Sequence, residues 1–382
     1  MAEPDRPAAG GSAKRPPPSA TEARGPLTLV TGFPRLLARR LIQAELQRTP
    51  EHEPPSRVAL LCHEAASAQA KEFAAALPEE QRARLQLLYG EVSHLHLGLS
   101  SAEYRALSGE VTDVLHAAES SQLSVDRAEL QRINVEGTRT ALDLAADAGR
   151  LRRFTHLSTV AVSGQRTGVV TEDELAMGQR FHDAWEETRY QAELLVRGAM
   201  AEVGCVVVRL GLLVGDSRTG EIDRFEGPHA LAMLLAQTPA SMPLPLPGDG
   251  GAPFNVVPID FAASAAHALH HHPNATGKTF HLVDPNPTSV RRVWEQIAQR
   301  SGRKLPRVRL GLRLADTLLR LPGLERLTRE QRSALAALGQ LTFYSSRNTV
   351  EALGQLRCPP IEGYLDVLID SLRAELRRRR EA

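Results

Sequence analysis

The stretch LTLVTGFPRLLARRL, Leu27 to Leu41, decides the fold. A short apolar run leads into a Thr-Gly turn, and the residues after the turn place apolar side chains on one face of a helix. A buried strand, a glycine turn and a helix form the first unit of a dinucleotide-binding fold. Such a turn usually carries two more glycines, but Arg35 and Ala38 occupy those positions. The stretch predicts the fold and raises the question of whether the turn still holds a nucleotide.

Further runs of the same kind follow, separated by helical patterns. They are rich in Val and Leu and lack polar alternation, which suits strands buried on both faces of a sheet. Helices between them imply right-handed crossovers between parallel strands. The sequence therefore predicts an α/β fold: a Rossmann-like doubly wound parallel sheet with a smaller, mainly helical C-terminal cap. The expected strands are Leu27–Thr31, Arg57–Cys62, Leu85–Tyr89, Val111–His116, Phe154–Ser158 and Val206–Leu210. The expected helices are Leu36–Gln47, Ala66–Ala76, Val135–Ala148, Ala184–Glu202, Phe261–His271, Ser289–Arg300 and Leu312–Arg320.

The pattern divides the chain into four segments. Residues 1–25 are rich in Pro, Ala, Gly and charge without apolar periodicity, so we expect a disordered tail. Residues 26–211 form the expected Rossmann-like core. Residues 212–375 form the expected cap or substrate domain, with segments returning to the core, because Gly- and Pro-rich loops begin there. Residues 376–382 form a basic tail, which we expect to be a solvated helix end.

Charge and composition exclude several function classes. The 382 residues carry a formal net charge of +1, which argues against a broad surface for nucleic acid or anionic membranes. We expect no integral membrane segment and no signal peptide, and hence a cytoplasmic protein, because no apolar run is long enough for either. Cys62 and Cys205 lie in apolar runs and are expected to be buried thiols.

Histidines near the end of one predicted helix are candidate metal ligands. They are His267, His270, His271 and His272. The sequence His-His-Pro-Asn favours a solvated turn over a metal site, and the three cysteines of the chain fit no zinc spacing. We therefore expect no bound metal.

Several phrases together resemble one family. They include TGFP at Thr31–Pro34, GEVSHLHLGLSSAEYRAL at Gly90–Leu107, NVEGT at Asn134–Thr138, LSTVAVSG at Leu157–Gly164 and FNVVPIDF at Phe254–Phe261. In this order they are similar to extended short-chain dehydrogenase/reductases of the thioester-reductase-like (male-sterility, fatty-acyl reductase-like) branch. The resemblance runs from about Gly25 to Leu372 and implies reduction of acyl thioesters or related carbonyl compounds with NADPH or NADH.

The resemblance also places the cofactor. It implies contacts from Gly32, Phe33, Pro34, Arg35, Ala38, Ala117 and Asn134. Gly32 keeps the tight turn after the strand. Arg35 stands where the backbone should approach the pyrophosphate, so its side chain either obstructs the approach or pairs with the phosphates. Ala38 is a milder change, and Glu119, after the fourth strand, either lies near the phosphates or faces solvent. NAD(P) is therefore a possible cofactor whose binding is in doubt, and the choice between NAD and NADP stays open.

Two of the three family positions for catalysis are substituted. Thr159 matches the Ser or Thr that hydrogen-bonds the substrate carbonyl, while Trp185 and Arg189 occupy the positions of the catalytic Tyr and Lys. An indole N–H does not ionise usefully and cannot supply the proton that a phenol would. Arg189 keeps the positive charge. His182, one turn before Trp185, is a speculative substitute acid, although a cap or surface role is the commoner one for such a histidine.

These substitutions suggest two functions. The first is a degenerate member, catalytically weak or inactive, that acts as a scaffold binding an acyl or other small-molecule ligand or a protein partner. The alternative is an NAD(P)H-dependent oxidoreductase acting on an acyl thioester or another carbonyl or hydroxyl substrate. Binding of NADH or NADPH with hydride transfer separates them.

Overall fold

The computed structural model describes residues 25–120, 126–223, 250–300 and 339–381. At its centre lies a seven-stranded sheet in the order β10-β7-β5-β4-β1-β2-β3, in which all neighbours are parallel. The predicted doubly wound sheet is confirmed, and the strand order reverses between β1 and β4. In such sheets the crevice at this reversal is where ligands bind. The strands are β1 Leu27–Val30, β2 Arg57–Cys62, β3 Leu85–Tyr89, β4 Asp113–His116, β5 Arg153–Thr159, β7 Cys205–Leu210 and β10 Thr279–Leu282.

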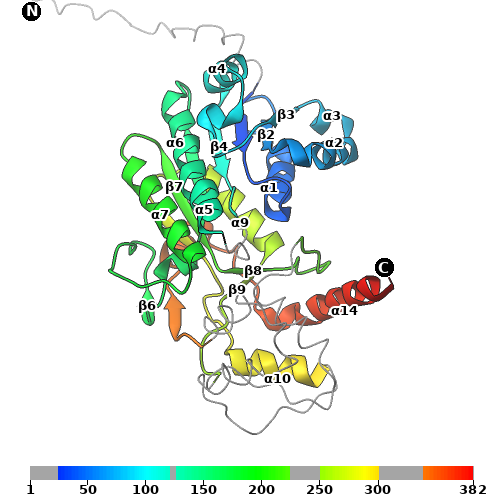
Figure 1. Ribbon diagram of the computed structural model, residues 1–382. Helices are drawn as coiled ribbons and strands as arrows, with labels where there is room; N and C mark the ends of the chain where they lie inside the picture. Colours follow the sequence, from blue (N-terminus) through cyan, green and yellow to red (C-terminus); the bar gives the residue numbers. More distant parts are fainter. Residues whose placement is uncertain (1–24, 121–125, 224–249, 301–338, 382) are drawn as a thin grey trace, which may run out of the picture.

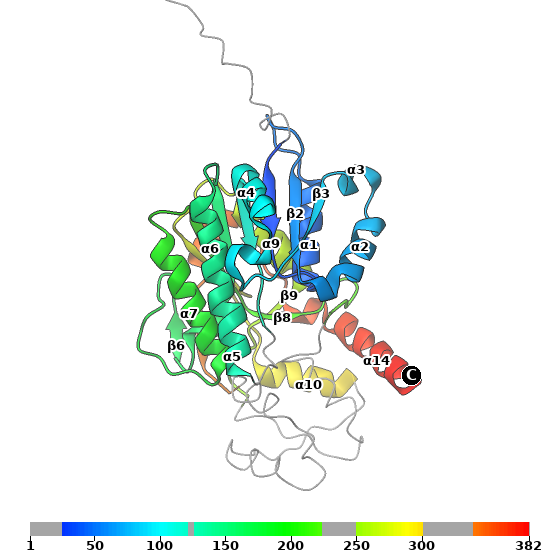
Figure 2. The same cartoon turned by 45° about the horizontal axis from the view of Figure 1, so that its top comes forward.

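Helices cover both faces of the sheet (Figures 1 and 2). One face carries α1 Leu36–Gln47, α2 Ser67–Ala76, α9 Ile259–His271 and α13 Arg347–Leu353. The other carries α4 Ser101–Glu110, α6 Gly137–Asp147 and α7 Ala184–Ala199. α1 forms because its apolar residues recur every three or four positions, which buries Leu37, Leu41 and Ile42 on one side. The shorter helices are α3 Glu79–Arg82 and α5 Arg127–Leu130.

Late segments of the chain complete the core. The seventh strand, β10, was not among the strands expected from sequence, and it extends the sheet beside β7. α9 packs against α1 and lies over the sheet. The helix that was expected at Phe261–His271 begins two residues earlier, at Ile259. The predicted solvated turn is wrong for His270, which is only 1% exposed, and for His267 and His271, whose rings contact Glu45.

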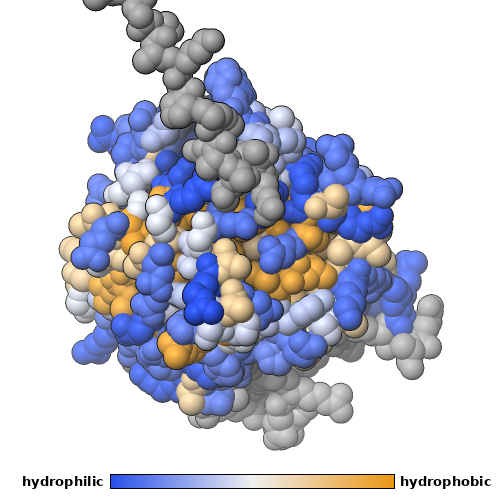
Figure 3. Space-filling view, turned by 90° about the horizontal axis from the view of Figure 1, so that it is seen from above, coloured by the Kyte–Doolittle hydropathy of each residue, from blue (hydrophilic) through white to orange (hydrophobic). Residues whose placement is uncertain are grey.

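The remaining elements lie beyond the carboxyl ends of the strands or beside the sheet. Beyond the strand ends are β8 Leu212–Val214, β9 Val256–Pro258, α10 Val290–Arg300 and α14 Leu365–Glu381, whereas β6 Gly168–Val170 pairs with β11 Thr342–Tyr344 (Figure 1). At the opposite end, hydrophilic residues surround smaller hydrophobic areas (Figure 3). The expected helix Leu312–Arg320 and nearly all of the expected tail 1–25 lie outside the described residues. Among the described helices, none is long and apolar enough to cross a bilayer.

The turn after β1 depends on Gly32. Its φ is +95°, and a Cβ built there would lie 2.5 Å from the carbonyl oxygen of Ala117, just after β4. The hydroxyl of Thr31 accepts hydrogen bonds from the backbone N–H groups of Ala117 and Ala118 at 3.2 and 3.1 Å. The ends of β1 and β4 are thereby held together at the floor of the crevice.

We expect Gly32→Ala to destabilise the protein by about 1–3 kcal/mol, because the new methyl group meets backbone and the residue must keep a left-handed φ. Urea unfolding followed by circular dichroism measures the change. Gly109→Ala, within α4 and with nothing within 4 Å of the new Cβ, is the matched control and should gain up to about 1 kcal/mol. Equal stability of Gly32→Ala and wild type would contradict the close approach.

Candidate functional site

The N-terminus of α1 faces the crevice and holds a carboxylate of the protein itself. Leu36, the first residue of the helix, donates its backbone N–H to Oδ2 of Asp223 at 2.6 Å. Asp223 belongs to the loop after β8, far along the chain. Free N–H groups and the helix dipole make such a terminus a binding site for anions, and dinucleotide-binding folds place the pyrophosphate there. In this structure a carboxylate takes that position.

Arg35 and Arg189 share a second carboxylate. Nη2 of Arg35 lies 3.3 Å from Oε1 of Glu119, and Nε of Arg189 lies 3.8 Å from Oε2 of the same group. Arg35 also places its Nε 3.6 Å from Asp223. We call these four residues, Arg35, Glu119, Arg189 and Asp223, the latch. It joins α1, the loop after β4, α7 and the loop after β8. The side chain of Glu119 is 23% exposed and lies between the two arginines.

Further ion pairs hold the same loop to α1. Arg40 contacts Asp216 at 3.0 Å and Glu221 at 2.8 Å, and Arg39 lies 3.8 Å from Glu221. Asp216 is almost buried, so its pairing with Arg40 is shielded from water more than a surface pair would be. These contacts fix residues 216–223 against the first two turns of the helix, and they give Asp223 its position at the helix end.

The other predicted positions in the turn have packing roles. Ala38 is fully buried, so the methyl group at the third glycine position is accommodated between helix and sheet. Phe33 is 7% exposed and packs against Phe73 of α2, with ring centroids 5.6 Å apart. Pro34 follows it in a cis peptide bond. Beside these residues lies a groove of about 580 Å³ between α1 and α2, whose lining carries three arginines, Arg35, Arg39 and Arg40, and as many carboxylates. Its other lining residues are Phe33, Pro34, Leu36, Gln43, Gln69, Glu72, Phe73, Ala76, Glu221 and Asp223.

Arg189 is a buried cation at the end of β5. It is 1% exposed, and its Nη2 donates to the carbonyl oxygen of Leu157. Burial lowers its pKa, while Glu119 and Glu193 oppose that effect. Burial, together with the charge of Arg189, lowers the pKa of His116 to about 3, so this imidazole is neutral at pH 7. The imidazole of His116 therefore adds no charge beside the guanidinium of Arg189.

The structure brings the three predicted catalytic positions to one region. Leu157, which Arg189 contacts, lies two residues before Thr159, the last residue of β5. The hydroxyl of Thr159 accepts from the backbone N–H of Ala161 at 3.2 Å. On the first turn of α7, the indole N–H of Trp185 donates to the carbonyl oxygen of Ser120 at 3.2 Å. Trp185 thus ties the start of α7 to the loop after β4.

Asn134 supports that same loop. Its side-chain oxygen accepts from the N–H of Ser120 at 2.8 Å, and its amide donates to the hydroxyl of Thr188 at 3.0 Å. The residue lies in a π-helical stretch, Gln131–Glu136, a distortion that often accompanies functional sites. In the described contacts Asn134 orients the loop that Trp185 touches.

His182, just before α7, is hydrogen-bonded to a carboxylate on the first turn of that helix. Its Nδ1 lies 3.0 Å from both oxygens of Glu186, and this hydrogen bond raises its pKa. Asp183 caps α7 by accepting from the N–H of Glu186 at 2.9 Å, as expected from sequence. Tyr190 packs on Phe181, with ring centroids 5.1 Å apart. The described contacts of His182 therefore belong to the N-terminus of α7.

Sequence reasoning missed the role of Asp223. The local sequence suggests mainly a charge that orders its own loop and secondarily a substrate contact, and nothing in it pairs the residue with a helix 187 positions earlier. The only available signal was the presence of arginines at Arg35, Arg39 and Arg40 together with a separate acidic loop. Chemically, the site as described combines a helix N-terminus with the guanidinium groups of Arg35 and Arg189, all of which lie against carboxylates of the protein itself.

We expect Glu119→Gln to lower the free energy of unfolding by about 1–3 kcal/mol, because it leaves the buried guanidinium of Arg189 without its nearest opposite charge. Urea unfolding gives the value. The control is Glu187→Gln, which removes the exposed pair with Arg127 on the surface of α7 and should cost less than about 1 kcal/mol. A loss at position 119 no larger than the loss at position 187 would show that the latch contributes no stability.

Comparisons with known proteins agree with this fold. The chain is 27% identical over 219 residues to the glycine betaine reductase ATRR of Emericella nidulans, covering 56% of this chain and 17% of that protein. It is 25% identical over 225 residues to the large subunit of the L-2-aminoadipate reductase of Penicillium chrysogenum. The match covers 55% of this chain and 16% of that protein. The chain therefore spans less than a fifth of the length of these relatives.

Solved structures show the same architecture. The terminal R domain of the myxalamid PKS-NRPS biosynthetic pathway superposes with a TM-score of 0.75 at 22% identity, covering 92% of this chain and 91% of that one. UDP-glucuronic acid 4-epimerase from Bacillus cereus in complex with NAD gives a TM-score of 0.65 at 17% identity, covering 91% and 99%. A family model for an NAD-binding domain, described as male sterility protein, matches residues 28–266. The chain belongs to the male sterility protein family of NAD-binding domains, as its sequence phrases indicated.

Proposed function

We propose that this chain is an NAD(P)-linked oxidoreductase of the reductase-domain type, acting on an acyl thioester or related carbonyl compound, whose cofactor crevice is held closed by the latch. The observation that carries the proposal is a pair of carboxylates in the crevice. Asp223 accepts a hydrogen bond from the N-terminus of α1, and Glu119 lies beside the guanidinium groups of Arg35 and Arg189. The crevice keeps the cations and N–H groups of an anion site, and the protein supplies the anions.

Family membership supports the oxidoreductase over the inactive scaffold. The matching family is of the NAD-binding type, and the relatives include proteins named as reductases. Gly32 keeps the turn on which nucleotide binding depends, and Ala38 fits without displacing the helix. These features favour a protein that still takes a dinucleotide, at a free-energy cost set by the latch.

Binding would exchange partners within the latch. Asp223 would leave the N–H of Leu36, and Arg35 would turn from the carboxylates to phosphate oxygens, which guanidinium groups bind well. Asp223 and Glu119 cannot stay beside a pyrophosphate without repulsion, so the loop that carries Asp223 must move. NAD(P), when bound, supplies or accepts the hydride.

The reaction would lack the usual proton donor. Thr159 can donate a hydrogen bond to a substrate carbonyl, and Arg189 can stabilise negative charge that develops there. Trp185 cannot deliver a proton to an alkoxide, and His182 is held by Glu186. Protonation would then fall to water, so we infer slow turnover.

A second candidate is a binding protein without turnover, which Trp185 and Arg189 at the family's Tyr and Lys positions favour. In that case the core, residues 26–211, and the cap, residues 212–375, would hold an acyl or other small-molecule ligand, or present a surface to a protein partner. A structural neighbour is described as a thiolation-reductase di-domain. An acyl carrier is therefore the protein partner that we propose for either candidate.

We expect wild type to bind NADPH or NADH weakly, and Asp223→Asn to bind the same nucleotide about 5- to 30-fold more tightly. A carboxylate at a partly buried helix N-terminus is worth about 1–2 kcal/mol, and its removal frees the site. Isothermal titration calorimetry measures both affinities. Asp143→Asn, the same change on the exposed side of α6, should bind as wild type does. If no variant binds either nucleotide, the chain is not NAD(P)-linked.

Restoring the family residues tests turnover. With an acyl-CoA or an aldehyde as substrate, Trp185→Tyr combined with Arg189→Lys should increase the rate of NADPH oxidation by about 10²–10⁴, the usual contribution of a general acid. Stopped-flow or steady-state absorbance at the nicotinamide band follows the reaction. Arg139→Lys on α6, which changes an exposed pair with Glu136, is the control. Nucleotide binding without hydride transfer in both wild type and the restored variant would favour the binding protein.

A further inference from the structure

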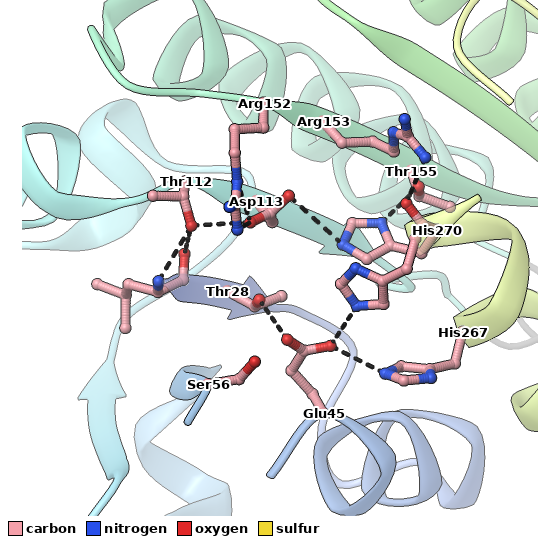
Figure 4. A network of polar contacts seen from close by, with 12 residues as sticks. Thr28, Glu45, Ser56, Thr112, Asp113, Arg152, Arg153, Thr155, His267 and His270 are labelled. Atoms are coloured by element: carbon pink, nitrogen blue, oxygen red, sulfur yellow. Dashed lines mark hydrogen bonds and ion pairs between the residues drawn. The ribbon is translucent and has the colours of Figure 1, made fainter. Parts of the chain in front are cut away.

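A carboxylate and two imidazoles converge where α1 packs against α9. Oε2 of Glu45 lies 3.0 Å from Nε2 of His267 and 2.7 Å from Nε2 of His271. The two histidines are four residues apart on α9, so one helix face presents both rings. All three atoms lie within 4.8 Å of one another. Figure 4 shows Glu45 between α1 and the ring of His267.

The surroundings hold these groups in place. Glu45 is fully buried, and its other oxygen, Oε1, accepts from the hydroxyl of Thr28 on β1 at 3.1 Å (Figure 4). The ring of His271 packs edge-on against His267 and His270, with centroids 4.8 and 4.6 Å apart. The side chains of His267 and His271 remain 19% and 18% exposed. The carboxylate is thus oriented from behind, while the imidazoles stay accessible from solvent.

We propose that Glu45, His267 and His271 form a binding site for a divalent transition metal of the Zn²⁺ class. Two imidazole nitrogens and one carboxylate oxygen are a ligand set typical of Zn²⁺, whereas Ca²⁺ and Mg²⁺ prefer oxygen alone. Three protein ligands leave a fourth tetrahedral position, which water can fill on the exposed side. Thr28 supplies the hydrogen bond to the ligating carboxylate that such sites usually have.

The two distances from the carboxylate fit a metal ion after a small adjustment. With bonds of about 2.0–2.1 Å in a tetrahedron, neighbouring ligand atoms are about 3.3 Å apart. The two distances from Glu45 are shorter than this by a few tenths of an ångström. Rotation of the two partly exposed rings can supply the change while Thr28 holds the carboxylate.

A bound metal would take the place of the hydrogen atoms that now lie between the two imidazoles and Glu45. Each imidazole now faces the carboxylate through Nε2, which must give up its hydrogen to become a ligand. A neutral ring keeps one hydrogen on Nδ1, and a protonated ring releases its second proton to solvent. No change of oxidation state is involved.

The site is separate from the cofactor crevice. Glu45 lies nine residues after Leu36 in α1, which places it about 13 Å along the helix from the end that Asp223 caps. Its ligands tie the far end of α1 to α9, a helix from the late part of the chain. The proposal therefore does not rest on NAD(P) binding or on catalysis.

The test uses the full chain, purified without a histidine tag and stripped with a chelator. Zn²⁺ is titrated in competition with a chromophoric chelator, and Co²⁺ serves as a spectroscopic probe. We expect about one equivalent of Zn²⁺ to bind wild type, and His271→Ala to weaken binding by about 100-fold or more. Thr28→Val should weaken it by about tenfold, because the carboxylate loses its orienting hydrogen bond. Bound Co²⁺ should show a tetrahedral d–d spectrum without a thiolate band.

His272→Ala is the matched control, because this neighbouring histidine accepts from the N–H of Asn274 and lies outside the cluster. It should bind Zn²⁺ as wild type does. If circular dichroism shows that His271→Ala does not fold, His267→Gln takes its place. Wild type that binds no Zn²⁺, equal binding by wild type and the ligand variants, or a thiolate band with Co²⁺ would overturn the proposal and leave the cluster as a hydrogen-bonded carboxylate.

Discussion

The carboxylate of Asp223 on the N-terminus of α1 is the contact on which the rest of the site depends. The fold aims this helix end at the crevice between β1 and β4, and its N–H groups need an acceptor. By taking that place, Asp223 brings the loop after β8 onto the core, and Arg40 then pairs with Asp216 and Glu221 in the same loop. The contact at the helix end and the ion pairs of Arg40 together hold this loop against α1.

The charged residues at the substituted motif positions lie beside residues of opposite charge. Arg35 adds a cation to the crevice, Arg189 keeps the positive charge of the lysine that it replaces, and Glu119 and Asp223 place two carboxylates beside them. A buried guanidinium such as Arg189 is stable only beside an opposite charge or a bound anion. Arg35 in place of glycine thus contacts two carboxylates of the protein, Glu119 and Asp223, and does not simply fill the turn.

The sequence predicted the regular part of the fold well, because periodicity and short apolar runs are local signals. The bounds of β2, β3 and α1 agree with those expected. β10 was missed because Thr279–Leu282 is short and lies within the segment expected to form the cap. The latch could not be found in this way. Glu119 was ambiguous, and its partners Arg35 and Arg189 come from a turn and a helix that only the folded sheet brings together. The same holds for Glu45 and the histidines of α9, where a run of His suggested a solvated turn.

α1 is held at both ends by late segments of the chain, and this restricts how the crevice can open. The loop after β8 caps its N-terminus, while His267 and His271 of α9 contact Glu45 near its C-terminus. The apolar face of the helix is packed on the sheet, with Leu41 and Ile42 fully buried. Movement of the helix would break that packing, whereas the loop is attached through half-exposed groups such as Glu221. A ligand that displaces Asp223 would therefore move the loop and leave α1 in place.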